Sequence, residues 1–527
     1  MKKILDAYLV TIVTFALLFL CAVALLWGLR KQTQSFYFQD ETDHVAMGWM
    51  MNTFNKNLYT DLSTNHQPIP VYFGAALMKG ISYNTLFDLI ERIRISMFIF
   101  FLITGIGLVL RFRERGLFAF ILTFSVGYYF FAWHVLAESI AVPTVIYLVL
   151  LVSEKLLYAD SKKAPDEFTD RIDSIVAGIS LAWVGFCLLP LWPFCALVAI
   201  YLFYTSHKDA RIFGLSAAVA VVTAVFWFTS PIDWYREAVT NNINYFIAYE
   251  EPLTVTEWGK IITFPFLSLA QPFNRHSQMF YVPLVIIALV LTYKFYRKTN
   301  IKTRQYLQFG FLYLLLLLLN PRVYTFPVAF FSGFHLFPYV AGFFSIFASL
   351  VYYSLSPKQM LNRIILLTLI IPLFVLNTPW LWEDKDKLNE YYVQYGTYES
   401  YAQLVKVVAG AESTFFSGPN GHGYLNIVSG VPIAGRQLFH LQWAYRSPQL
   451  RAEFHELYAT DPPEFIYMTE DTSGYHTDLS PILKTQYTPV LHDNKQTFLY
   501  FRDDIAAAIT PEQAKYMQEK DFSFYQK

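Results

Sequence analysis

The stretch Gln39-Asp40-Glu41-Thr42-Asp43-His44 follows the first long apolar segment of the chain. It places three acids and a histidine within five residues at the boundary of that segment. A polar, proline-marked stretch, Asn65-His66-Gln67-Pro68-Ile69-Pro70, then leads into the apolar residues 71–78. Carboxylates at a membrane boundary cost free energy unless water solvates them or a function uses them, so these residues form a candidate functional site. The alternative is a loop whose acids only face water.

The composition places the chain among membrane proteins. Of its 527 residues, 55% are hydrophobic and 15% are charged, whereas soluble proteins carry about 25% charged residues. Several apolar runs approach the roughly 20 residues needed to cross the hydrocarbon layer, which predicts a polytopic helical membrane protein. The formal net charge is zero and no basic patch stands out, so nucleic acid is not expected as a partner. The three cysteines lie in apolar segments without metal-ligand spacing, and we interpret them as small core residues.

Clusters of lysine and arginine predict the orientation of the helices, because cytoplasmic loops carry an excess of these residues. Placing every cluster in the cytoplasm gives about eleven spans, with the N-terminus inside and the C-terminus outside. The first apolar run is long and lacks a small-residue cleavage site, so we interpret it as a retained span rather than a signal peptide. The predicted spans are residues 8–29, 93–110, 117–133, 139–157, 173–189, 191–205, 212–230, 279–296, 305–320, 338–355 and 364–380.

The topology divides the chain into a transmembrane module, residues 1–381, and an extracytoplasmic domain, residues 382–527. Within the first outer loop, residues 31–92, the apolar residues 71–78 are too short to span and predict an interfacial helix between Pro68 and Gly80. The outer loop at residues 231–278 is rich in aromatic residues and favours a second interfacial helix, with guidance of a substrate as the alternative.

The polar C-terminal region is predicted to be a small α/β domain, because short apolar strands alternate with helical spacing. Strands are expected at residues 413–417, 465–468 and 497–502, and helices at residues 400–411 and 451–459. Residues 511–526 are expected to form a terminal helix or a tail. The glycine-rich residues 418–423 favour a tight turn over a phosphate cradle.

Polar residues from separate outer loops converge on one side of the membrane in this topology. Acids supply a general base or metal ligands, and arginine and histidine supply charge for a phosphate. No Walker glycine loop, HExxH zinc motif or nucleophile elbow occurs in the sequence. An outward site cannot draw directly on ATP or nucleotide sugars, so an activated donor is expected to arrive on a lipid. The converging residues are Asp40, Glu41, Asp43, His44, His66, Arg92, Arg94, His134, Glu138, Asn320, Arg322, Tyr324 and His335.

Asp40-Glu41, Tyr59 and the stretch His66-Gln67-Pro68-Ile69 resemble the first external loop of C-type (GT-C) membrane glycosyltransferases. The most similar groups are the protein O-mannosyltransferases and the aminoarabinose transferases. Arg92, Arg94, Glu138 and the outward C-terminal domain also match the pattern of that class. The sequence departs from it at Gln67, where the first proline of a pair is usual, which puts the contact with the lipid there in question.

The resemblance implies an inverting glycosyltransferase that moves a sugar from a polyprenyl phosphate to an acceptor hydroxyl. The acceptor would be a glycan, a lipid or a protein. Short cytoplasmic loops and the lack of an evident sorting signal favour a prokaryotic plasma membrane as the setting. Asp40 would be the general base, and Glu41 and Glu138 would complete the catalytic set. A divalent metal held by Asp40, Glu41 and Glu138 is left open, and no other cofactor is expected. The residues that would bind the donor phosphate or lipid are His66, Arg92, Arg94, Arg322, Tyr324 and His335.

Structural interpretations compete with these roles. Asp43 and His44 would cap a helix, Glu138 would end a helix in water, and His134 and His335 would be interfacial or structural residues. Arg92 and Arg94 would anchor a span at the headgroups. For the whole chain, the alternatives are a transporter or lipid flippase, a polymerase or ligase of lipid-linked polysaccharides, and a scaffold without catalytic activity. The glycine- and proline-broken helix pairs typical of transporters are not visible in the sequence.

Overall fold

The computed structural model describes residues 41–125, 127–130, 132–157, 167–246, 259, 290, 302–319, 334–354, 384–417, 423–438, 444–468 and 474–525. By its internal contacts the chain divides into two compact units. The first unit comprises Met1–Thr33, Arg94–Val225 and Pro252–Asp384. The second unit comprises Gln34–Ile93, Phe226–Glu251 and Lys385–Lys527.

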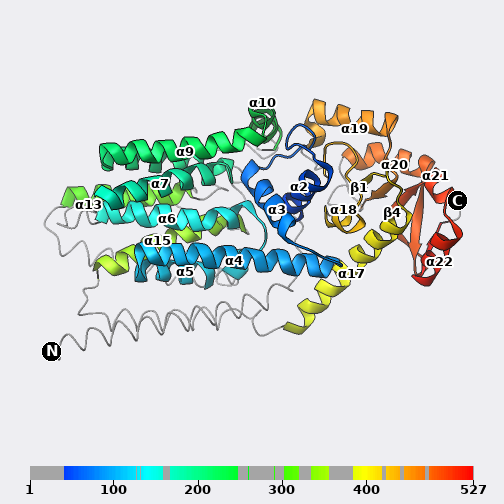
Figure 1. Cartoon of the computed structure of the whole chain (residues 1–527), viewed down its shortest axis with the longest axis horizontal. Helices are drawn as coiled ribbons and strands as arrows, with labels where there is room; N and C mark the ends of the chain where they lie inside the picture. Colours follow the sequence, from blue (N-terminus) through cyan, green and yellow to red (C-terminus); the bar gives the residue numbers. More distant parts are fainter. Residues whose placement is uncertain are drawn as a thin grey trace. The chain divides into compact units, whose positions relative to one another are not determined.

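Apolar helices make up the described part of the first unit. Figure 1 shows α5, α6, α7, α13 and α15 running side by side, and α6 packs against α5, α7 and α15. Helix α6 is apolar around its whole circumference and nearly all of it is buried, as expected for a central helix. The helices are α4 (Leu86–Phe112), α5 (Glu114–Ser125), η1 (Gly127–Phe130), α6 (Ala137–Leu157), α7 (Glu167–Gly185), η2 (Leu189–Leu191), α8 (Trp192–Thr205), α9 (Lys208–Phe228), α13 (Lys302–Leu318), η6 (Phe334–Leu336) and α15 (Phe337–Ser354).

Most predicted spans that fall on described residues coincide with helices. By length and composition, α4, α6 and α9 are able to cross a membrane, and α8, α13 and α15 contain shorter apolar stretches. The span predicted at residues 117–133 is wrong in extent. Helix α5 ends at Ser125 and a short 3-10 helix begins at Gly127, because glycine is unfavourable inside an α-helix. The spans at residues 8–29, 279–296 and 364–380 lie outside the described residues, and the total of about eleven stays a prediction.

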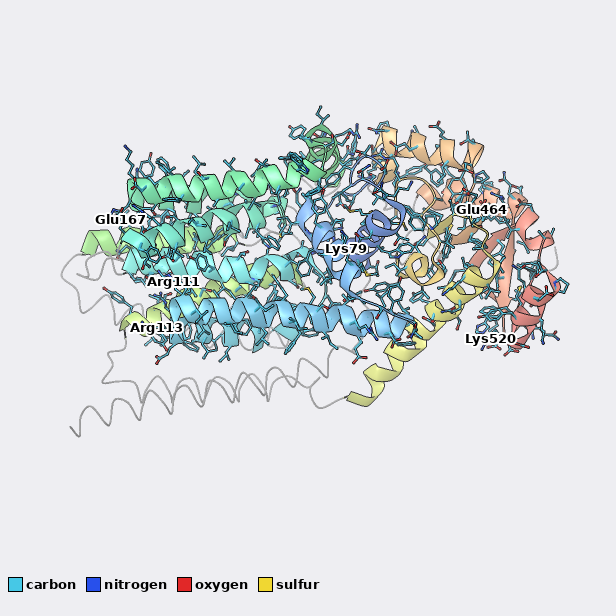
Figure 2. All side chains as sticks on the ribbon, in the orientation of Figure 1. Lys79, Arg111, Arg113, Glu167, Glu464 and Lys520 are labelled. Carbon is cyan, nitrogen blue, oxygen red and sulfur yellow. The ribbon has the colours of Figure 1, made fainter. Side chains whose placement is uncertain are left out.

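Ion pairs join the helices at one end of the first unit, where Figure 2 shows Arg111, Arg113 and Glu167. Arg111 donates from Nε and Nη2 to the two carboxylate oxygens of the fully buried Asp173, at 2.6 Å each. Glu154 accepts from Arg111 at 3.1 Å and from Arg115 as well. Because these residues come from α4, α5, α6 and α7, the network fixes how the four helices pack at this end.

The second unit contains two helices that follow the first predicted span and a helical segment from the later outer loop. Helix α2 (Glu41–Phe54) packs against α3 (Pro68–Gly80), which confirms the helix predicted between Pro68 and Gly80. The described start of the aromatic-rich loop forms α10 (Pro231–Trp234) and the π-helix η3 (Tyr235–Phe246). The helix predicted in that loop is therefore confirmed as far as residue 246.

A five-stranded sheet with flanking helices follows in the same unit. Its strand order is β1-β2-β4-β3-β5, with β1 and β2 parallel and the other pairs antiparallel. The buried side chains Phe416, Phe454, Ile466 and Tyr487 form part of its core. The elements are α17 (Asp384–Val408), β1 (Phe415–Ser417), α18 (Gly423–Ser429), η9 (Ala444–Arg446), α19 (Pro448–Thr460), β2 (Phe465–Tyr467), α20 (Gly474–Gln486), β3 (Tyr487–His492), β4 (Lys495–Arg502), α21 (Asp503–Ala507), α22 (Pro511–Glu519) and β5 (Phe522–Phe524).

The strands predicted near residues 415, 465 and 499 and the helix predicted at residues 451–459 are confirmed. The helix predicted at residues 400–411 is the last part of α17, which begins at Asp384. The expectation of a terminal helix over residues 511–526 is wrong beyond Glu519. Asp521 has a φ of 57°, which turns the chain so that β5 pairs with β3.

Candidate active site

The described part of the acidic stretch, residues 41–44, lies at the start of α2, and α2 is held against α3 by close contact between the backbones of the two helices. A Cβ atom on Gly48 would lie 2.2 Å from the backbone nitrogen of Ala75, and one on Gly74 would lie 2.3 Å from the carbonyl oxygen of His44. Only glycine allows this approach. Glu41 and the other residues of α2 through Met50 are therefore buried, although the helix begins with charged side chains.

Asp43 and His66 form an ion pair in the second unit. The Oδ2 atom of Asp43 lies 3.1 Å from Nε2 of His66, and the ring of His44 meets the His66 ring edge-on with 4.6 Å between centroids. Burial raises the pKa of the Asp43 carboxyl, and the pairing with His66 opposes this shift. Burial lowers the pKa of His44, so His44 is neutral. Asp43, one of the converging polar residues for which helix capping was the alternative interpretation, thus contacts the predicted site residue His66.

Residues 59–67, which we call the His66 segment, begin at a residue with an unusual backbone conformation. Tyr59 is fully buried with a φ of 67°. Its backbone nitrogen donates to the carbonyl oxygen of Leu62 at 2.7 Å, and its hydroxyl donates to the carbonyl oxygen of His66 at 2.7 Å. A residue other than glycine in this region costs about 1–3 kcal/mol and persists only when its surroundings hold it. The hydroxyl of Tyr59 therefore ties the strained turn directly to His66.

Gln67 holds the other end of the His66 segment. Its side chain is buried, donates from Nε2 to the carbonyl oxygen of Ala238 at 3.1 Å, and accepts from Nε1 of Trp234 at 3.2 Å. Asn242 donates to the carbonyl oxygen of Asn65 at 2.7 Å. The departure from the usual proline at Gln67 thus has a local explanation, because the glutamine binds α10 and η3.

Two further pairs lie around the start of α6 in the first unit. Arg94 and His134 are fully buried, with Nη2 of Arg94 at 3.0 Å from Nε2 of His134. Glu138, in the first turn of α6, is buried and lies 2.5 Å from Nδ1 of His335 through Oε1. The packing of α6 against α15 brings these two residues together, since His335 lies in η6, which directly precedes α15. Contacts that involve a charged group fix the orientation of the side chains that make them.

The structure distinguishes the two predicted arginines of α4. Arg92 is exposed and donates to Oγ of Ser82 at 2.9 Å, whereas Arg94 is fully buried. Both residues lie inside α4, close to residue 93, where the second span is predicted to begin. Helix α4 begins at Leu86, because the hydroxyl of Thr85 accepts from the backbone nitrogen of Asp88 at 3.2 Å in the manner of an N-cap.

Three predicted site residues, Asp40, Arg322 and Tyr324, lie outside the described residues. Among the residues that are described, no group of three His, Cys, Asp or Glu side chains is arranged to hold a metal ion. The metal interpretation of the sequence included Asp40, so it stays an open prediction.

No protein-family model and no curated protein sequence matches the chain. Two crystal structures of ArnT from Cupriavidus metallidurans do match it. The structure in the apo state has a TM-score of 0.50 at 13% identity and covers 93% of this chain and 98% of ArnT. The structure bound to undecaprenyl phosphate has a TM-score of 0.52 at 12% identity and covers 92% of this chain and 97% of ArnT. This chain has the ArnT fold.

ArnT is an aminoarabinose lipid A transferase of the GT-C class, so the resemblance stated from the motifs is confirmed at the level of the fold. The identity to ArnT is low, and the likeness therefore concerns the arrangement of the elements. The motif comparison did not single out Asp43 or His134 as site residues. The sequence did carry a signal for both, since each is a polar residue close to an apolar segment. Their partners, His66 for Asp43 and Arg94 for His134, are distant in sequence, so the contacts themselves could not be predicted.

Proposed function

We propose that this protein is an inverting glycosyltransferase that uses a sugar linked to a polyprenyl phosphate. The acceptor hydroxyl belongs to a glycan, a lipid or a protein, and the reaction takes place at the extracytoplasmic face of a prokaryotic plasma membrane. The observation that carries the proposal is the ArnT fold over nearly the whole chain, because one matched ArnT structure holds undecaprenyl phosphate. The motifs at Asp40-Glu41 and at His66 add independent support.

In this proposal the acceptor oxygen attacks the anomeric carbon while the bond from that carbon to the phosphate oxygen breaks. Asp40 takes the proton of the hydroxyl, and the electron pair of the breaking bond leaves with the polyprenyl phosphate. One in-line displacement of this kind inverts the anomeric centre. Glu138, fixed by His335, orients the acceptor or shares the role of the base, and Glu41 completes the acidic set.

The leaving phosphate needs its negative charge stabilised more than it needs a proton. His66 is suited to this task, because the Asp43 carboxylate fixes the orientation of its ring. Arg94 is better suited than Arg92, since a buried guanidinium acts in a medium that screens charge less than water does. Arg322, Tyr324 and His335 complete the proposed donor-binding set. A divalent metal, if bound by Asp40, Glu41 and Glu138, would supply further stabilisation of negative charge.

The proposal is tested by transfer of a radiolabelled sugar from a polyprenyl phosphate into native membrane extract. We expect transfer by the wild type and a loss of about 10²- to 10⁴-fold in Asp40→Asn, which retains size but not basicity. Asp88→Asn is the matched control in the same predicted outer loop and should transfer normally. Equal transfer by Asp40→Asn and wild type would remove Asp40 as the base. Movement of labelled lipid across the membrane without transfer would favour the flippase alternative instead.

A further inference from the structure

Arg436, from the C-terminal part of the second unit, forms hydrogen bonds with the beginning of the His66 segment. Its Nη2 atom donates to the carbonyl oxygen of Tyr59 at 2.7 Å, and its own carbonyl oxygen accepts from the backbone nitrogen of Ser63 at 2.7 Å. The Nη1 atom of Arg436 pairs with Glu453 at 2.9 Å. Residues that are 377 positions apart in sequence thus share a direct hydrogen bond.

Glu237 of η3 completes this contact from a third segment of the chain. Its carboxylate is 2% exposed and accepts from Nη2 of Arg436 at 3.1 Å and from Oγ of Ser63 at 2.9 Å. Asn241 and the neighbouring Arg236 also bind it. A buried carboxylate is tolerated only when charge and hydrogen bonds compensate it, so Arg436 and Glu237 depend on each other. Together they enclose the Ser63 turn between the C-terminal domain and η3.

Tyr59 connects Arg436 to His66 through two hydrogen bonds. Arg436 binds the carbonyl oxygen of Tyr59, and the hydroxyl of Tyr59 donates to the carbonyl oxygen of His66. Tyr59 has a left-handed backbone that needs such external contacts to persist. The position of His66 is therefore set in part by a side chain of the C-terminal domain.

We propose that Arg436 is a positioning residue for donor binding, and that the C-terminal domain is in this way an integral part of the donor-phosphate site. The proposal rests on the proposed function in so far as His66 binds the donor phosphate. Arginine suits this position because its planar guanidinium directs several donors at fixed angles, and here it serves the three acceptors Tyr59, Glu237 and Glu453. Lysine would supply the charge without this geometry.

The test compares full-length Arg436→Met and Arg436→Lys with wild type and with Arg451→Met. Arg451 is an exposed arginine of α19 that stacks on Tyr445 and touches no residue of the His66 segment among the described contacts. The first measurement is the rate of tryptic cleavage after Lys56, just before the segment. The second is kcat and KM for a polyprenyl-phosphate sugar.

We expect Arg436→Met to be cleaved faster and to show a KM about tenfold higher for the donor, because a small displacement of a binding group weakens contact with its ligand strongly. Arg436→Lys should lie between it and the wild type, and Arg451→Met should match the wild type. A purely structural role would lower the amount of folded enzyme and leave the KM of the remainder unchanged. Wild-type values of KM and cleavage in Arg436→Met would overturn the proposal.

Tyr59→Phe keeps the proposal testable if Arg436→Met does not fold. It removes the hydroxyl that binds His66 and keeps the buried ring, so the donor KM should rise while Arg436 stays in place. An unchanged KM in this variant would contradict the connection to His66. If wild type transfers no sugar but Arg436→Met is still cleaved faster, the contact of Arg436 with the segment stands and the proposed glycosyltransferase function fails.

Discussion

At the residue scale, the acidic stretch combines side chains with opposite requirements. Asp43 is buried where ionisation is unfavourable, yet it lies beside His66, which favours the ionised form. Burial is the larger effect, so the folded protein holds the Asp43 carboxyl at a raised pKa. The contribution of such a group to the stability of the fold is fully present below its unfolded pKa and is lost as the pH rises through the folded pKa.

Asp43→Asn separates stability from activity. The amide removes the charge, so at neutral pH the unfolding temperature of the variant should be no lower than that of the wild type. In acid, where Asp43 is protonated, the two unfolding temperatures should converge. Transfer should nevertheless fall about ten- to a hundredfold, which corresponds to the loss of a charged hydrogen bond of about 1.5–3 kcal/mol. Thermal unfolding at two pH values and the transfer rate check this. A variant that is both less stable at neutral pH and fully active would contradict it.

Gln67→Ala tests the second anchor of the His66 segment. It leaves the indole nitrogen of Trp234 and the carbonyl of Ala238 without their glutamine partner, and should destabilise the second unit by about 1–3 kcal/mol. Denaturant unfolding of the purified protein measures this. Gln67→Pro would restore the usual proline pair of the class but should be equally destabilised, since proline makes neither bond. Wild-type stability in both variants would show that the anchor is dispensable.

The candidate site residues that the sequence analysis proposed are those with a local signal. Asp40, Glu41 and His66 stand in short motifs beside an apolar run, and Glu138 begins a predicted helix. Arg436 and Glu237 have no such signal, because their importance comes from contacts across 377 and 174 positions. The pairing of Asp43 with His66 also needed the close packing of α2 on α3, which depends on two glycines that sequence patterns do not single out.

For the individual helices, the length of the apolar runs in the sequence predicts where most helices lie but not where they begin and end. The starts of α4 and α7 lie several residues before the predicted spans, because polar side chains extend both helices beyond the apolar part. The strand β5 is too short for a periodic pattern, and it forms because a positive φ at Asp521 returns the chain to β3. Local turn conformations of this kind leave little trace in composition.

The packing of α4, α6 and α7 is tested by Asp173→Asn. The substitution leaves Arg111 without its buried bidentate partner, so we expect a loss of about 3–5 kcal/mol in stability. Asp209→Asn is the matched control, because Asp209 is 57% exposed in its pair with Arg171 and should contribute only about 0–1 kcal/mol. Thermal unfolding in detergent reports both values. Equal stability of the two variants would show that the buried network does not hold these helices.

At the scale of the whole molecule, the charge distribution predicts which ends of the helices face the cytoplasm. Arg111 and Arg113 lie at one end of the first unit, and the sheet domain follows the last predicted span. The number of spans depends in part on segments outside the described residues. The orientation of the helices is predicted from the charge of the loops alone. The likeness to ArnT, in contrast, was found only by comparing the full arrangement of helices and sheet.

Cysteine labelling in intact cells tests this orientation. Arg113→Cys and Lys520→Cys each place a thiol at an exposed position, one between α4 and α5 and one after α22. A membrane-impermeant maleimide should label Lys520→Cys in intact cells and Arg113→Cys only after permeabilisation. The unsubstituted protein controls for the native cysteines, of which Cys187 is buried. The reverse pattern would invert the topology and move the proposed site to the cytoplasmic face.

The proposed donor is a polyprenyl-phosphate sugar, and release of the lipid product tests this without knowledge of the acceptor. Purified wild type is incubated with labelled polyprenyl-phosphate sugar and native membrane extract, and free polyprenyl phosphate is followed by mass spectrometry. We expect release by the wild type that depends on the extract and falls by about 10²- to 10⁴-fold in Asp40→Asn. No release by folded wild type from any of several donor sugars, or equal release by Asp40→Asn, would contradict the proposed reaction.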